Sequence, residues 1–204
     1  YINIKNNRKY KFNKKMQFKI LIQARLSSTR LPGKVLFKLG ETNYSSISLM
    51  IKRLKKKYAL NQIAILTTYD ECDDAINEEA NNLNVECFRG SKEDVLKRYY
   101  ESAKAMNIKN IIRLTSDCPF IDPFEVERVL KIHLLNKNDY TTNSFENSTI
   151  VDGMDVEVIS FEALKKAYLE ANLPSEREHV TFYFNKNNKF KVERTDPNLQ
   201  KNYI

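Results

Sequence analysis

Short apolar runs alternate along the chain with longer segments in which apolar residues recur every three or four positions. The runs predict buried strands at 18–22, 62–67, 84–88 and 110–115, and shorter β segments around Tyr140, at 156–159 and at 190–194. The periodic segments predict helices at 46–58, 71–82, 91–106, from 123 onward and at 161–171. Such alternation is typical of βαβ units. We therefore expect a three-layer α/β/α sandwich with a mainly parallel, Rossmann-like sheet.

Residues that favour helix starts refine these boundaries. The signals stand at Ser91 (with Asp94 three positions later), Asp122 (before Pro123), Ser160 and a capping box at Ser175–Glu178. A carboxylate followed by proline at the first helical position is a frequent helix start. We therefore interpret Asp122 as a cap rather than a catalytic acid.

The composition is that of one globular domain. The 204 residues are 42% hydrophobic and 11% aromatic, with four glycines and five prolines. No apolar run approaches the roughly 18 residues of a membrane span, so we predict none. The cysteines, Cys72, Cys87 and Cys118, are widely spaced and odd in number, which predicts neither a zinc site nor a disulfide framework. A reducing, cytoplasmic environment fits this pattern.

The net charge of +8 lies mainly in a basic polar extension at residues 1–15. This extension holds six Lys or Arg residues and no acid, so the domain that we assign to 16–204 is nearly balanced. We expect no specific nucleic-acid binding by the domain. An RNA-binding protein that uses the extension is an alternative, and steep salt dependence of binding would support it.

A cationic, hydroxyl-rich loop follows the first predicted strand. The segment Gln23–Lys34 contains Arg25, Arg30 and Lys34 together with three hydroxyl residues and a Pro-Gly turn. In open α/β sheets, ligands bind beyond the carboxyl ends of the strands, and this side-chain set suits a polyphosphate. An ordinary basic surface loop explains the composition equally well.

The order of residues in this loop is more specific than its composition. Ala24-Arg-Leu-Ser-Ser-Thr-Arg-Leu-Pro-Gly-Lys34 resembles the nucleotide-binding signature of the sugar cytidylyltransferases. Supporting blocks are Phe88–Tyr99, Arg113–Pro123, Asp152–Val158 and Glu178–Thr181, in the expected order. The family includes the acylneuraminate and 3-deoxy-manno-octulosonate cytidylyltransferases, and the chain looks most similar to the spore-coat-polysaccharide SpsF-like branch.

The resemblance implies a nucleotide-diphospho-sugar transferase-like fold and a function. The implied reaction transfers CMP from CTP to a sugar or sugar acid, with Mg²⁺ and release of pyrophosphate, in surface glycan synthesis. Homodimers are plausible for this family, but the sequence identifies no interface.

The resemblance also assigns roles to individual residues. Implied nucleotide-binding residues are Gln23, Ala24, Arg25, Ser28, Thr29, Arg30, Lys34, Gly90, Ser91 and Arg113. Implied catalytic residues are Arg25, Lys34 and Asp117, and Asp117 is also the expected Mg²⁺ ligand because it follows an apolar strand. A turn aspartate is the alternative for Asp117, and an ion-pair partner is the alternative for Arg113.

Implied substrate-binding residues are Asp94, Arg98, Asp155, Glu157 and His179. Each has a structural alternative. Asp94 also fits a helix cap, Arg98 and His179 fit helix surfaces, and the two carboxylates at 155 and 157 fit a surface ladder on one strand face. We assign no role to Cys118 or His133.

One expected feature is missing. The family has a second metal-binding aspartate near the carboxyl end, which this chain does not show. Either the chain is cut short, or Asp155 or Glu157 replaces this ligand, or the metal site is incomplete. A nucleotide-sugar glycosyltransferase and a non-catalytic nucleotide- or sugar-binding module therefore remain alternatives.

Overall fold

The computed structural model describes residues 18–28 and 31–197. Within them, seven strands form one sheet in the order β3-β2-β1-β4-β6-β5-β7. The strands are β1 (Phe18–Gln23), β2 (Ile63–Thr68), β3 (Glu86–Gly90), β4 (Asn110–Thr115), β5 (Tyr140–Thr142), β6 (Glu157–Ser160) and β7 (Val192–Arg194). The strand β6 runs antiparallel to both of its neighbours, and all other pairs are parallel.

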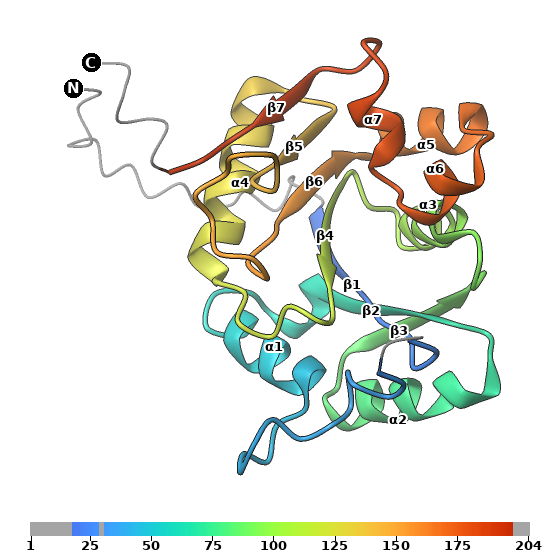
Figure 1. Ribbon diagram of the computed structural model, residues 1–204, viewed down its shortest axis with the longest axis vertical. Coiled ribbons are helices and arrows are strands. Elements are labelled where there is room, and N and C mark those ends of the chain that lie inside the picture. Colours follow the sequence, from blue (N-terminus) through green and yellow to red (C-terminus); the bar gives the residue numbers. More distant parts are fainter. Residues whose placement is uncertain (1–17, 29–30, 198–204) are drawn as a thin grey trace.

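Helices cover both faces of the sheet, as Figure 1 shows. They are α1 (Ser46–Leu54), α2 (Asp74–Asn82), α3 (Val95–Ala105), α4 (Pro123–Asn136), α5 (Phe161–Glu170), α6 (Pro174–Glu178) and α7 (Phe182–Asn185), with 3₁₀ turns η1 (Leu60–Gln62) and η2 (Glu71–Asp73). Alternate residues of β1 point to opposite faces: Ile20 and Ile22 pack in a cluster with α1, α2 and α4, whereas Leu21 packs with α3, α5 and α7. The three-layer, mainly parallel prediction is confirmed.

The topology places a crevice beside β1. The chain proceeds from β1 outward through β2 to β3, and then returns to place β4 on the other side of β1. At such a reversal the loops that leave the two central strands turn in opposite directions and leave a hollow at the carboxyl ends of the strands. The loops after Gln23 and Thr115 both lie at this position.

The predicted caps were partly right. The side chains of Asp122 and Ser160 accept hydrogen bonds from the backbone of the first turns of α4 and α5, as expected. The prediction at Ser91 was wrong, because Asp94 caps α3 and Ser91 Oγ accepts from the Asp94 N–H at 3.0 Å. The box at 175–178 was also misplaced, since α6 begins at Pro174 and the Glu176 side chain accepts from the Leu173 N–H.

The helix predicted at 46–58 is shorter than expected and ends at Leu54. Three lysines follow it, at 55–57, in tight turns that bring Tyr58 back into the core. In the described residues, no helix combines the length and apolar character that a membrane crossing requires. The extension at 1–15 lies outside the described residues.

A buried histidine on α4 predicts that the fold loses stability in acid. His133 on α4 is only 1% exposed, and its Nδ1 lies 3.0 Å from Thr141 Oγ1. Burial lowers the pKa of His133 to about 4, against an opposing effect of Asp139 and Glu193. In the unfolded chain this pKa returns to about 6.5, so below that pH the unfolded state binds the extra proton. We expect His133 to cost about 3 kcal/mol of the free energy of unfolding as pH falls from about 6.5 to about 4.

Urea unfolding at pH 7 and pH 4.5 measures this cost. In His133→Gln, which retains a hydrogen-bonding side chain without a titrating group, the difference between the two pH values should be smaller by most of that amount. His179→Gln is the matched control, because His179 is exposed. Equal pH dependence in the wild type and His133→Gln would contradict the assignment.

Candidate active site

A polar pocket of about 230 Å³ lies at the carboxyl ends of β1 and β4. Its lining residues are Gln23, Arg25, Ser28, Lys34, Val35, Thr115, Ser116 and Asp117. Five of the predicted site residues, namely Gln23, Arg25, Ser28, Lys34 and Asp117, are therefore brought together here. Thr29 and Arg30 lie outside the described residues, and Ala24 is buried beside the pocket.

Backbone hydrogen bonds anchor the loop after β1 to β2 and close it on itself. The Ala24 N–H donates to Leu66 O at 2.9 Å, and Leu26 O accepts from the N–H groups of Ser28 and Gly33 at 2.8 and 2.9 Å. Gly33 has a φ of +76°, and a Cβ there would lie 3.1 Å from the Phe37 ring. Only glycine meets both conditions without strain. This closure holds Arg25 and Ser28 at the mouth of the crevice.

Lys34 and Asp117 form an ion pair across the pocket. Lys34 Nζ lies 3.0 Å from Asp117 Oδ2, and the two side chains are 29% and 47% exposed. Burial by itself would raise the pKa of Asp117, but hydrogen bonds with Lys34 and Thr115 and the charge of Lys34 lower it below the ordinary value. Asp117 is therefore an ionised, reachable carboxylate at neutral pH.

Three lining residues, Val35, Thr115 and Ser116, were not predicted. Thr115 and Ser116 directly precede Asp117, so the rule that places ligands at strand ends would have found them. Ser46 Oγ at the start of α1 donates to Ser116 O and fixes this turn. A second hollow of about 270 Å³ adjoins the polar pocket, shares Lys34, Val35 and Asp117 with it, and adds the apolar residues Leu31, Phe37, Leu39 and Pro119.

Arg113 and Glu157 form a buried ion pair behind the pocket. Arg113 Nη1 pairs with Glu157 Oε2, and Arg113 Nη2 donates to Gln23 Oε1 at 3.3 Å. Tyr140 OH donates to the other carboxylate oxygen of Glu157 at 2.7 Å. Burial disfavours the charge of Arg113, yet Glu157 outweighs it and raises the pKa of Arg113. The arrangement matches the ion-pair alternative for Arg113 and orients the amide of Gln23 in the pocket.

Asp155 lies close to other carboxylates. Burial raises its pKa, a hydrogen bond with Ser144 opposes this, and the negative charges of Asp152, Glu157 and Asp117 raise it further. No group of three or more His, Cys, Asp or Glu side chains placed to hold a metal ion occurs in the described part of the chain. Of these carboxylates, Asp117 is the one that lines the polar pocket.

The segment between β3 and α3 lies away from the lining of this pocket. Gly90 allows Arg98 to pass beneath it, since a Cβ on Gly90 would lie 2.8 Å from Arg98 Cγ. Arg98 is fully buried, so the surface alternative for it is wrong, and its Nη1 donates to Ser91 O at 3.0 Å. Asp94 Oδ2 accepts from Arg177 Nε at 3.0 Å. These contacts fix the backbone of the β3–α3 turn.

His179 follows α6 and is exposed, with its ring 4.5 Å from that of Phe182. The binding roles predicted for His179, Asp94, Arg98 and the two carboxylates at 155 and 157 stay predictions.

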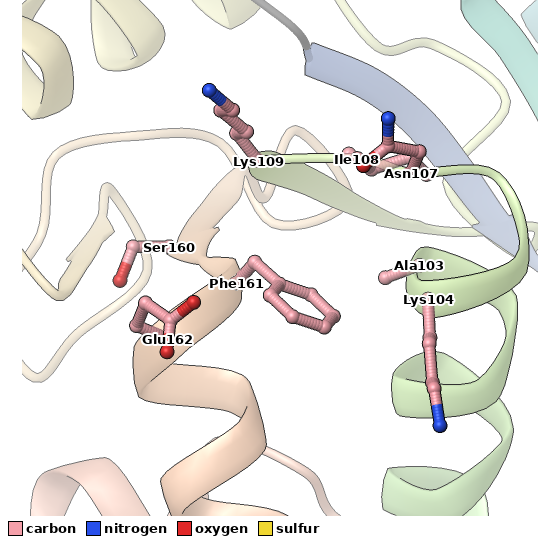
Figure 2. Close-up of a pocket in the computed structure, with 8 residues that line it drawn as sticks. All are labelled: Ala103, Lys104, Asn107, Ile108, Lys109, Ser160, Phe161 and Glu162. Carbon is pink, nitrogen blue, oxygen red and sulfur yellow. The ribbon is translucent and has the colours of Figure 1, made fainter.

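Another pocket, of about 440 Å³, lies at the other end of β4 and contains none of the predicted site residues (Figure 2). Its lining is Ala103, Lys104, Asn107, Ile108, Lys109, Ser160, Phe161 and Glu162. Lys109 directly precedes β4, whereas the polar pocket begins where β4 ends. The larger hollow is thus separate from the crevice that the topology creates.

Comparisons with known proteins agree with this geometry. A family model described as "Cytidylyltransferase" matches residues 19–202. The spore coat polysaccharide biosynthesis protein SpsF of Bacillus subtilis is 32% identical over 170 residues, which are 80% of this chain and 68% of the relative. An uncharacterised protein of Methanocaldococcus jannaschii is 39% identical over 178 residues, which are 87% and 71% of the two chains.

Solved structures give the same result. A cytidylyltransferase from Leptospira borgpetersenii superposes with a TM-score of 0.83 at 38% identity, over 89% of this chain and 76% of that one. A CMP-2-keto-3-deoxy-manno-octonic acid synthetase in complex with CTP has a TM-score of 0.64 at 15% identity, over 88% and 89% of the two chains, and shows the shared fold. The family match covers the whole polar pocket and nearly the whole described chain, and so the chain belongs to the cytidylyltransferase family.

Proposed function

We propose that this protein transfers CMP from CTP to a sugar or sugar acid, with release of pyrophosphate, in the synthesis of a surface glycan. Membership of the cytidylyltransferase family supports a nucleotidyltransferase that uses CTP. The name of the Bacillus subtilis relative supports polysaccharide synthesis as the setting. The observation that carries the proposal is the Lys34–Asp117 pair, which joins the loop after β1 to the end of β4 across an open polar pocket.

The phosphates of CTP fit the side chains of this pocket. Arg25 and Lys34 offer positive charge, and Ser28 offers a hydroxyl. Arginine binds phosphate through two parallel N–H groups, whereas lysine acts as a mobile point charge. We assign the base to the side of Gly90 and Ser91, where Arg98 fixes the turn. The nucleotide would then span from β3 to β4, and the acceptor sugar would lie near Asp155.

The reaction needs few protein groups. An oxygen of the sugar attacks the α-phosphorus in line, a new O–P bond forms, and the bond from the α-phosphorus to the bridging oxygen breaks to release pyrophosphate. Lys34 stabilises the negative charge that grows on the pyrophosphate as it leaves. The sugar hydroxyl loses its proton, and we assign Asp155, whose pKa is raised, as the carboxylate that orients this hydroxyl and accepts the proton.

Asp117 fits a role as Mg²⁺ ligand. Its carboxylate is ionised and nearly half exposed, and Mg²⁺ in proteins commonly keeps several waters and binds one or two carboxylates plus phosphate oxygens. A bound Mg²⁺ would neutralise phosphate charge and hold the triphosphate for in-line attack.

We expect Asp117→Asn to abolish the Mg²⁺ dependence of CTP binding. The amide retains the size of the side chain but loses the charge that attracts the cation, so added Mg²⁺ should no longer strengthen CTP binding by about tenfold or more. Calorimetric titration with CTP, with and without Mg²⁺, measures the effect. Asp122→Asn is the matched control, because Asp122 only caps α4 and asparagine caps equally well. Unchanged Mg²⁺ dependence in Asp117→Asn would remove Asp117 from the metal site.

The function itself is tested by titrating the chain with CTP, ATP, GTP and UTP in Mg²⁺, followed by assays of pyrophosphate release with sugars and sugar acids. Selective CTP binding and pyrophosphate release are the expected results. CTP binding without pyrophosphate release with any of these acceptors would favour the non-catalytic module. Absence of CTP binding would refute the proposal. The described cysteines, Cys72, Cys87 and Cys118, form no disulfide with one another.

A further inference from the structure

Asp73 is a buried carboxylate outside the polar pocket, at the end of η2 and directly before α2. Its exposed fraction is 0%. Asp73 Oδ1 accepts from the Leu26 N–H at 2.8 Å, and Oδ2 accepts from the Thr68 N–H at 3.2 Å and from Thr68 Oγ1 at 2.5 Å. The carboxylate thus joins the loop after β1 to the carboxyl end of β2.

The position of Asp73 suggests a helix cap, but the side chain does not act as one. Asp73 is the residue before α2, and its side chain makes no capping hydrogen bond to that helix. Both oxygens instead bind groups from other segments, 47 and 5 residues away in the sequence. Because a buried carboxylate is costly unless it is hydrogen-bonded, these contacts explain why it is tolerated here. They also identify the loop after β1 as its main distant partner.

Asp73 contacts Leu26, the residue whose carbonyl oxygen closes the loop after β1. Leu26 O accepts the N–H groups of Ser28 and Gly33, and the N–H of the same residue is held by Asp73. Arg25 and Ser28, on either side of Leu26, line the polar pocket. Displacement of the Leu26 backbone would therefore move both pocket residues together.

We propose that Asp73 is a positioning residue: it holds the backbone of Leu26, and with it Arg25 and Ser28, in the geometry that binds the nucleotide phosphates before the nucleotide arrives. Asp73 itself touches no ligand, since it is fully buried. Prior ordering of a loop strengthens binding because the ligand does not have to order it. The inference rests on the proposed function only in naming CTP as the ligand of the loop.

Asp73→Ala tests this role. Alanine has no acceptor, so both the Leu26 and the Thr68 backbone N–H groups lose their side-chain partner. We expect the dissociation constant for CTP with Mg²⁺ to rise about tenfold. Thr68→Val is the matched control: it removes the bond from Thr68 Oγ1 and leaves the Leu26 contact intact. It should lower the melting temperature but change CTP binding by less than about twofold.

A measurement on the unmutated protein keeps the test independent of how well the variant folds. The Leu26 amide should be protected from hydrogen exchange in the absence of nucleotide, whereas an amide of an unanchored loop exchanges rapidly. Rapid exchange at Leu26, or wild-type CTP affinity in Asp73→Ala, or an equal loss of affinity in Thr68→Val would each overturn the proposal. If the wild type binds no CTP, the proposed function fails, while protection at Leu26 still decides whether Asp73 anchors the loop.

Discussion

Lys34→Met should reduce the rate of CMP transfer, measured as kcat, by about 100- to 1,000-fold, because it removes a charge that stabilises the departing pyrophosphate. The fold should hardly change. Lys34 is partly exposed, and its ion pair with Asp117 is of the kind that contributes about 0–1 kcal/mol to stability. We therefore expect a melting temperature within about 3 °C of the wild type. Steady-state kinetics and thermal unfolding of the same preparation measure the two effects.

Lys38→Met is the matched control for this prediction. Lys38 belongs to the same segment after β1, and its backbone forms a bridge with Ser45, but its side chain is exposed and does not line the pocket. Wild-type kcat is expected in this variant. A melting temperature that falls in Lys34→Met by much more than about 3 °C would show that Lys34 is structural. A wild-type kcat in this variant would remove Lys34 from the catalytic machinery.

Local features of the site were the most predictable from the sequence. The run 18–22 is apolar at every position except Lys19, which identified a buried strand, and the cationic loop after it then had to lie at the carboxyl edge of the sheet. The start of α4 was also predictable, because the cap and its target amide are two residues apart. Such signals depend on neighbours in the chain and need no knowledge of the fold.

The misplaced start of α3 shows the limit of local signals. Ser91 and Asp94 both have side chains that favour an N-cap, and the sequence does not say which of the two backbones leaves the helical conformation. In the structure they act in series, since Ser91 Oγ accepts from the Asp94 N–H and Asp94 Oδ1 accepts from the Lys97 N–H. Arg177 then pairs with Asp94 from 83 residues away and supports this choice.

Most of the site features that could not be predicted from the sequence are contacts between residues that lie far apart in the chain. Lys34 and Asp117 are 83 residues apart, and Asp73 and Leu26 are 47 apart. Arg113 and Glu157 meet only because β4 and β6 are antiparallel in a register that places these two residues opposite each other. A sequence that predicts each strand does not predict which strands pair, so the ion-pair and ligand-binding alternatives for Arg113 were equivalent before the register was known.

Glu157→Leu should destabilise the protein by about 3–5 kcal/mol, because it leaves the Arg113 guanidinium buried without its partner. The side chains of this pair are only 14% and 11% exposed, so water cannot replace the lost carboxylate. Tyr140 OH would also lose its acceptor. Urea unfolding at pH 7 measures the change in the free energy of unfolding. Asp155→Asn is the matched control: the pKa of Asp155 is raised, which means that its charge is unfavourable in the folded state, so stability should be unchanged or higher.

The double variant Arg113→Met/Glu157→Leu separates a structural ion pair from a substrate contact. Removing both charges leaves no unpaired ion, and well-packed apolar replacements of a buried pair are often neutral. We expect the double variant to be more stable than Glu157→Leu by at least about 2 kcal/mol, so the effects of the two substitutions should be strongly non-additive, as is usual for residues in direct contact. If the changes in the free energy of unfolding caused by the two substitutions were additive instead, the two residues would act independently. A loss of CTP affinity in Arg113→Met without loss of stability would then place Arg113 on the nucleotide, while Gln23 would need another residue to orient its amide.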